Sequence, residues 1–200
     1  MLAEQYQALS VAELVAVVAA LLYLLLAIRQ NIWCWLFAGL STALYVVLFI
    51  GAKLYMESVL NVFYFAMAVY GFRFWLVHGR DTSGPRVTRW PLPVHAVAIL
   101  AILVPSCVTG FVLARSTDAE FPYIDSMTTF AAFWATFLVA RKVLENWWYW
   151  LVIDTVSIWL YWERGLALTA LLFVAYVVMI PFGLIAWTRS MRDRPEAAGT

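Results

Sequence analysis

A carboxylate and two tryptophans share one face of a predicted helix in the last third of the chain. Trp147, Trp150 and Asp154 are spaced i, i+3 and i+7, which places their side chains in one stripe. An indole beside a carboxylate suits a flat, cationic organic solute, because the solute stacks on the ring while the carboxylate meets its charge. The alternative for Asp154 is a buried hydrogen bond between two helices.

Weaker candidates for solute contacts lie on other predicted helices. Asn61 and Tyr64 share a face, and the Asn61 amide can both donate to and accept from an amide or a ribose. Packing between helices accounts for Asn61 equally well. Trp35, Ser41 and Thr129 complete the predicted binding set, although Ser and Thr hydroxyls on helices usually bond to their own backbone.

The composition requires that these residues sit in a membrane protein. The chain of 200 residues is 65% hydrophobic and only 12% charged, and it contains 11 Trp, 10 Tyr and 13 Phe. Soluble domains are about half apolar and a quarter charged, so a water-soluble globule is excluded. The net charge of +1 gives no indication of a nucleic-acid partner. We therefore expect membrane lipid to surround the chain.

Seven apolar runs are long enough to cross a bilayer as helices, since a span needs about 20 residues. The predicted all-α spans are 11–28, 31–50, 54–77, 91–114, 123–140, 146–162 and 165–187. Alternating sides puts Lys53, Arg115 and Arg164 on one side and the other basic residues opposite. The positive-inside rule then predicts an external N-terminus and a cytoplasmic tail at 189–200.

The chain also aligns with itself when it is shifted so that Tyr64 meets Tyr176. In this register, which we call the repeat alignment, Gly71 meets Gly183 and Trp75 meets Trp187. A slip of three residues then aligns Trp33 and Trp35 with Trp148 and Trp150. We predict two parallel three-helix repeats, 11–77 and 123–188, joined by a linker helix at 91–114, with a solute held between the repeats.

Motifs of other protein classes are missing from the sequence. It has no G-x-x-x-x-G-K-[ST] phosphate loop, no G-x-S-x-G and no H-E-x-x-H, which argues against ATP hydrolysis and an intramembrane hydrolase. His78 and His95 form no paired metal-ligand motif, and Cys34 and Cys107 lie in apolar runs. We predict no catalytic residues, metal or cofactor, and an intramembrane enzyme is a distant alternative.

The motif Arg141-Lys142-x-x-Glu145-Asn146-Trp147-x-x-Trp150-x-x-x-Asp154 resembles the PnuC-type vitamin transporters, as does the stretch from Leu54 to Gly71. The likeness spans about residues 11–188. It implies a seven-helix fold distantly similar to SWEET carriers, assembled as a homotrimer in the bacterial inner membrane. It further implies facilitated diffusion of a vitamin precursor for NAD biosynthesis, trapped inside by a cytosolic kinase.

The resemblance implies substrate contacts for Trp150 and Asp154, and Trp147 matches the first tryptophan of the motif. Nicotinamide riboside carriers commonly have Gln in the third span and Asn seven residues later, where this chain has Asn61 and Ala68. The last motif position is Asp instead of Asn. These departures concern the identity of the vitamin more than the family. Nicotinamide riboside is the first expected substrate, and thiamine or riboflavin is the alternative.

Overall fold

The computed structural model describes residues 2–51, 55–79, 84–117, 120–163 and 167–193, with side chains from residue 11 onward except at 55–57 and 167–169. The elements in these ranges are seven helices. They are α1 (Leu2–Ile28), α2 (Cys34–Gly51), α3 (Tyr55–His78), α4 (Leu92–Ser116), α5 (Pro122–Ala140), α6 (Asn146–Glu163) and α7 (Ala167–Asp193). Parts of the predicted charge pattern and tail, namely Lys53, Arg80, Arg164 and 194–200, lie outside the described residues.

The prediction of seven helices is confirmed, and most of the predicted ends agree to within a few residues. Five of the described helices, α1, α2, α3, α4 and α7, are long and apolar enough to cross a membrane. Helices α5 and α6 are long enough but less apolar, because they carry hydroxyl groups, tyrosine, tryptophan and the carboxylates of Asp125 and Asp154.

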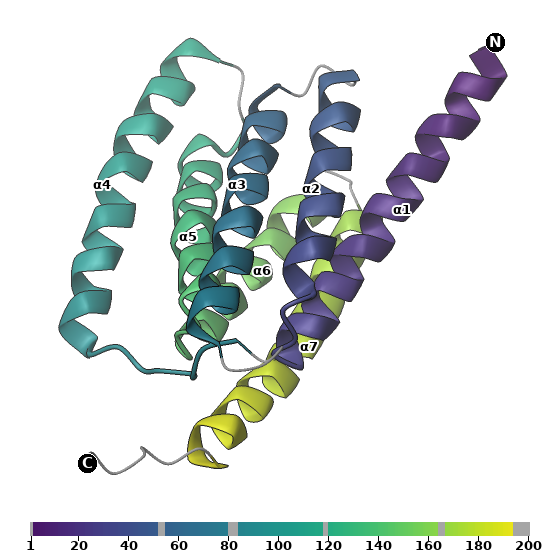
Figure 1. Cartoon of the computed structure of the whole chain (residues 1–200). Coiled ribbons are helices and arrows are strands. Elements are labelled where there is room, and N and C mark those ends of the chain that lie inside the picture. Colours follow the sequence, from purple (N-terminus) through teal and green to yellow (C-terminus); the bar gives the residue numbers. More distant parts are fainter. Residues whose placement is uncertain (1, 52–54, 80–83, 118–119, 164–166, 194–200) are drawn as a thin grey trace. The chain divides into compact units, whose positions relative to one another are not determined.

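Residues 1–86 and 87–200 form two compact units, which we describe separately. In the first unit α2 packs against both α1 and α3, and neighbouring helices alternate in direction (Figure 1). The Ser41 hydroxyl donates to the carbonyl of Ala16 over 2.8 Å, which ties α2 to α1. Ser58 similarly donates to the carbonyl of Val46 over 3.2 Å and ties α3 to α2.

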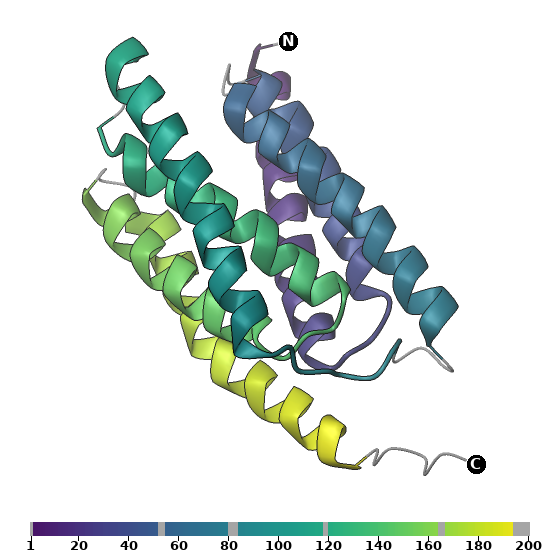
Figure 2. The ribbon, with the colours of Figure 1, turned by 90° about the vertical axis from the view of Figure 1, so that its left-hand side faces the viewer.

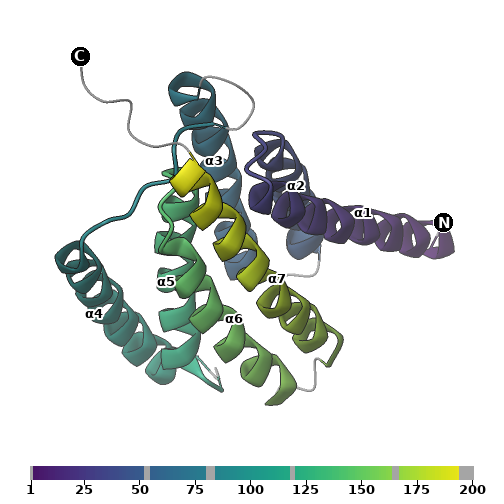
Figure 3. The same ribbon diagram turned by 90° about the horizontal axis from the view of Figure 1, so that it is seen from below.

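In the second unit α4, α5, α6 and α7 pack in sequential order (Figures 2 and 3). Small residues let α4 approach α5 closely, and a Cβ added at Gly110 would collide with Tyr123. The segment before α4 is bound to the turn between α5 and α6. There Thr88 N–H donates to the carbonyl of Lys142 over 3.1 Å, and Leu144 N–H donates to the carbonyl of Thr88 over 2.8 Å.

The turn after α1 and the turn after α5 have the same hydrogen-bond pattern. In the first turn Gln30 N–H donates to Ala27 O and Asn31 N–H to Leu26 O. In the second, Lys142 N–H donates to Val139 O and Val143 N–H to Leu138 O. Gln30 and Lys142 both have φ of 57°. Each helix therefore ends in a Schellman motif with a left-handed residue at the position where glycine is usual.

A tryptophan is fixed against a glycine and a second tryptophan in each unit. Trp35 of α2 meets Trp75 of α3 edge to face at 5.7 Å, and a Cβ at Gly71 would collide with the Trp35 ring.

Trp147 of α6 meets Trp187 of α7 at 5.4 Å in the same way, over Gly183. The repeat alignment thus continues in one register through both turns into α2 and α6. The predicted slip of three residues is wrong, and Trp35 corresponds to Trp147 rather than to Trp150.

Candidate functional site

Helix α6 carries a stripe of aromatic and polar side chains along one face. Trp147 and Asp154 are buried, with 3% and 4% of their surfaces exposed, and Trp150 is half-buried between them. Asp154 lies near the middle of the helix, about 12 Å from its first residue at a rise of about 1.5 Å per residue. The sequence located this stripe correctly.

The Asp154 carboxylate has no hydrogen bond or ion pair with any residue that the structure describes. A buried, unpaired carboxylate is costly, because it loses its hydration and receives nothing in exchange. Trp150 is likewise without a ring contact or hydrogen bond to the described residues. Side chains of this kind are available to a solute, whereas a paired acid would hold helices together.

Two hydroxyl groups, those of Thr129 on α5 and Ser157 on α6, could also form hydrogen bonds with a solute. Most described Ser and Thr hydroxyls on these helices bond to their own backbone, as Thr136 does to Ala132 and Thr155 to Leu151. Thr129 and Ser157 make no such bond within the described part of the chain.

Ser157 is buried and lies three residues after Asp154, on the same stripe. Ser157 is not among the residues predicted from the sequence, although its spacing of three residues from Asp154 places both on one face of the helix.

Trp147 is used for packing, because its ring fills the space over Gly183 against Trp187. Its indole nitrogen is nevertheless buried with no acceptor among the described residues, and the same is true of Trp35. The adjacent Asn146 donates from Nδ2 to the carbonyl of Val143 over 2.6 Å, and its Oδ1 is buried without a partner in the same ranges. The Trp147 indole nitrogen and Asn146 Oδ1 can therefore still form hydrogen bonds near the start of α6.

The predicted residues of the first unit lie on α2 and α3. Ser41 has its hydroxyl proton committed to Ala16, so only its acceptor capacity is left. Asn61 is buried and Tyr64 is half-buried, with the Tyr64 ring 5.9 Å from that of Phe63. Asn61 and Tyr64 share a face of α3 with Gly71, the contact point of Trp35.

A groove in the second unit contains none of the predicted site residues. It has a volume of about 320 Å³ and lies between α4, α5 and α6. Its α6 wall includes Trp148, Val152 and Val156, which lie on the side of the helix opposite Trp150 and Asp154. The two sides of α6 therefore differ in chemistry, one being polar and the other apolar.

The polar side of α6 can bind a solute with a positive charge, an aromatic ring and hydroxyl groups. The carboxylate of Asp154 supplies the negative charge, and the Trp150 indole supplies a stacking surface. Ser157 and Thr129 supply hydroxyl donors and acceptors. No group of His, Cys, Asp or Glu that could hold a metal ion occurs in the described ranges.

Long apolar helices that carry buried polar side chains without described partners are typical of multi-pass membrane proteins that bind a small solute. Comparison with known proteins agrees with this class. Residues 10–189 match the family model described as nicotinamide mononucleotide transporter, and the chain belongs to that family.

Curated relatives in this family are transporters of vitamins. The chain is 27% identical to the nicotinamide riboside transporter PnuC of Escherichia coli strain K12, over 95% of this chain and 90% of that protein. It is 26% identical to the riboflavin/roseoflavin transporter RibM of Streptomyces davaonensis, over 94% and 90%. The relatives are transporters, in agreement with the expectation that the chain is not an enzyme.

The fold also matches a solved structure. The crystal structure of the vitamin B3 transporter PnuC aligns with a TM-score of 0.74 and 24% identity, over 92% of this chain and 83% of that one. The prediction of an all-α, multi-pass membrane protein with the fold of PnuC is therefore confirmed.

Proposed function

We propose that this protein carries nicotinamide riboside across the bacterial inner membrane by facilitated diffusion. The observation that carries the proposal is the buried carboxylate of Asp154, unpaired within the described residues, on the same face of α6 as Trp150. The pyridinium ring of nicotinamide riboside is flat and positively charged. It satisfies both groups at once, by stacking on the indole and by pairing with the acid.

The charge of the site favours the riboside over the mononucleotide for which the family is described. A phosphate group adds a charge of about −1.5 to −2 at neutral pH. Helices α5 and α6 contain no Lys or Arg that would compensate it, and Asp154 would repel it. A nucleoside with its single positive charge has no such conflict.

Thiamine and riboflavin are the alternative substrates. Thiamine is also flat and cationic, so the carboxylate and indole suit it equally well. Riboflavin is favoured by the similarity to RibM, but its ring is uncharged and leaves Asp154 without a counter-charge. Uptake of a neutral vitamin would therefore require that Asp154 be protonated or hydrogen-bonded to the ligand.

The proposal also includes the remaining contacts predicted from the sequence. Trp147 and Trp35 would contribute their indole N–H groups, which have no acceptor among the described residues, and Thr129 would contribute its hydroxyl. Asn61, Tyr64 and Ser41 are proposed from the sequence pattern alone.

We also propose the arrangement expected from the sequence, with repeats at 11–77 and 123–188 and a linker helix at 91–114. The matching turns after α1 and α5 support a duplication of three helices. The distribution of basic residues supports an external N-terminus and a cytoplasmic C-terminus. A cytosolic kinase would trap the vitamin for NAD biosynthesis, and the working assembly would be a homotrimer.

The proposal is tested with purified protein in liposomes. Labelled nicotinamide riboside should equilibrate across the bilayer without ATP or an ion gradient, and unlabelled nicotinamide riboside, thiamine, riboflavin and nicotinamide mononucleotide should be compared as competitors. We expect the riboside to compete best and the mononucleotide to compete poorly. Competition by riboflavin alone would contradict the assignment of a cationic substrate, and uphill accumulation driven by a proton gradient would contradict facilitated diffusion.

A further inference from the structure

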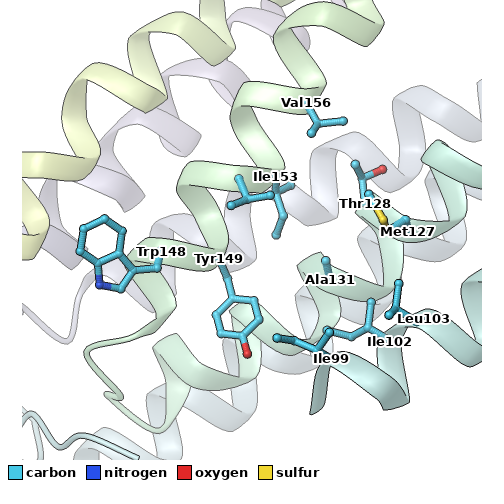
Figure 4. Close-up of a pocket in the computed structure, with 11 residues that line it drawn as sticks. Ile99, Ile102, Leu103, Met127, Thr128, Ala131, Trp148, Tyr149, Ile153 and Val156 are labelled. Carbon is cyan, nitrogen blue, oxygen red and sulfur yellow. The ribbon is translucent and has the colours of Figure 1, made fainter. Parts of the chain in front are cut away.

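A narrow apolar groove runs along the second unit between α4 and α6, with α5 as its floor (Figure 4). It exists because α4 packs against α5, whereas the backbone of α4 does not come close to the backbone of α6. Four of its residues are 40–61% exposed, so one side of the groove is open. The lining residues are Ile99, Ile102, Leu103, Met127, Thr128, Ala131, Trp148, Tyr149, Val152, Ile153 and Val156.

One end of this groove is polar. Tyr149 lines the groove, and its hydroxyl lies 3.1 Å from His95 Nδ1. One helical turn before Tyr149, Glu145 Oε2 accepts a hydrogen bond from Trp90 N–H over 3.3 Å and lies 3.9 Å from His95 Nε2. Glu145 Oε1 lies 3.9 Å from Arg89 Nε.

Arg89 lies near this polar end of the groove, and its guanidinium group can still donate to further hydrogen-bond partners. Its side chain is 62% exposed, and Glu145 approaches it through Nε alone. The terminal guanidinium nitrogens have no partner among the residues that the structure describes. A guanidinium of this kind can bind a phosphate through two parallel hydrogen bonds.

We propose that the groove holds one acyl chain of an anionic phospholipid and that Arg89 binds the phosphate of the same lipid. The groove lining is carbon almost throughout, so it offers nothing to a polar solute. Its open side faces the surroundings of a membrane protein, where acyl chains are the abundant apolar molecules. Basic side chains at the membrane surface are the usual partners of anionic headgroups.

The dimensions favour an acyl chain over a helix from a second copy of the protein. The groove follows α6 from Trp148 to Val156, a length of about 12 Å at about 1.5 Å per residue. A volume of about 320 Å³ over that length gives a mean cross-section of roughly 27 Å². A helix about 10 Å across has a cross-section of roughly 80 Å², so a helix could lie across the groove but could not fill it, whereas a single acyl chain fits within it.

The test uses the full chain in nanodiscs made of equal parts phosphatidylglycerol and phosphatidylcholine, followed by native mass spectrometry of the released protein. We expect wild-type protein to retain phosphatidylglycerol preferentially. Ala131→Phe fills the floor of the groove and should abolish retention, whereas Ala101→Phe, on an exposed part of α4 outside the groove, should not. If Ala131→Phe does not fold, Val156→Phe on the α6 wall replaces it.

The headgroup contact is tested separately. Arg89→Ala should lower the preference for phosphatidylglycerol about fivefold, since one basic residue near an anionic surface contributes about that much. Arg192→Ala removes an exposed charge from the last turn of α7 and should leave the preference unchanged.

Equal retention of both lipids by wild type, or unchanged retention in the filled variant, would overturn the proposal. Loss of a bound second copy in the filled variant would overturn it as well, because the groove would then be a subunit contact.

Discussion

Helices α1–α3 and α5–α7 share a scaffold but differ in chemistry. Both sets have the same turn after the first helix, and in both a tryptophan of the second helix is fixed over a glycine of the third. In the repeat alignment, however, Asp154 corresponds to Thr42 and Ser157 to Tyr45. The Thr42 hydroxyl donates to the carbonyl of Ala38 in its own helix over 2.8 Å, whereas Asp154 has no described partner.

The difference separates the residues that pack one helix against another from the residues that we propose to bind the solute. The tryptophan and glycine positions that fix the second helix of each set against the third are the same in both sets, because packing tolerates few alternatives once a large ring is buried. The positions that we propose to face the solute are free to differ, because the solute is asymmetric. We therefore expect substitutions at equivalent positions to have equal effects on stability but unequal effects on transport.

The largest effect is expected from Asp154→Asn, which keeps the shape of the side chain and removes its charge. Binding of a cationic vitamin should weaken at least about 30-fold, the equivalent of about 2 kcal/mol for losing one partner of a buried charge pair. Direct binding of labelled nicotinamide riboside to purified protein measures the change. Thr42→Val at the equivalent position removes only a bond within α2, and a comparable loss of binding there would contradict the asymmetry.

The second-largest effect is expected on stability, from filling the space over the glycines at which a tryptophan ring packs in each set of helices. Gly71→Ala and Gly183→Ala should each lower the free energy of unfolding by about 1–3 kcal/mol, because the new Cβ displaces a buried indole. Thermal unfolding in detergent measures both. Gly39→Ala is the matched control, since its Cβ would lie at an ordinary 3.8 Å from Phe65. A marked difference between the Gly71 and Gly183 variants would show that the two sets of helices are not equivalent in packing.

The smallest effects are expected from replacing Ser157 or Ser41 with alanine. Ser157→Ala should weaken vitamin binding about fivefold, or about 1 kcal/mol, without lowering the unfolding temperature, because its hydroxyl makes no described bond. Ser41→Ala should lower the unfolding temperature, since its hydroxyl ties α2 to α1. Measuring both properties on both variants gives the comparison, and a Ser157→Ala protein that unfolds early but binds normally would assign Ser157 to packing.

We expect no counterpart of the groove between α4, α5 and α6 in helices α1–α3. It depends on α4, which follows the first three helices and lies outside the repeat alignment. Its apolar residues are spread over three helices and were not recognisable in the sequence as a group. Only the packing of α4 on α5 brings them together.

The amino-acid sequence by itself determined the membrane class, the seven helices and the stripe of Trp147, Trp150 and Asp154, because hydropathy and helical spacing are local properties of the chain. The tertiary structure decided which of these side chains are already used. It showed Trp147 fixed over Gly183, Ser41 bonded to α1, and Asp154 and Ser157 buried without described partners. Whether a polar side chain is satisfied depends on neighbours that are distant in the sequence, so spacing along one helix cannot reveal it.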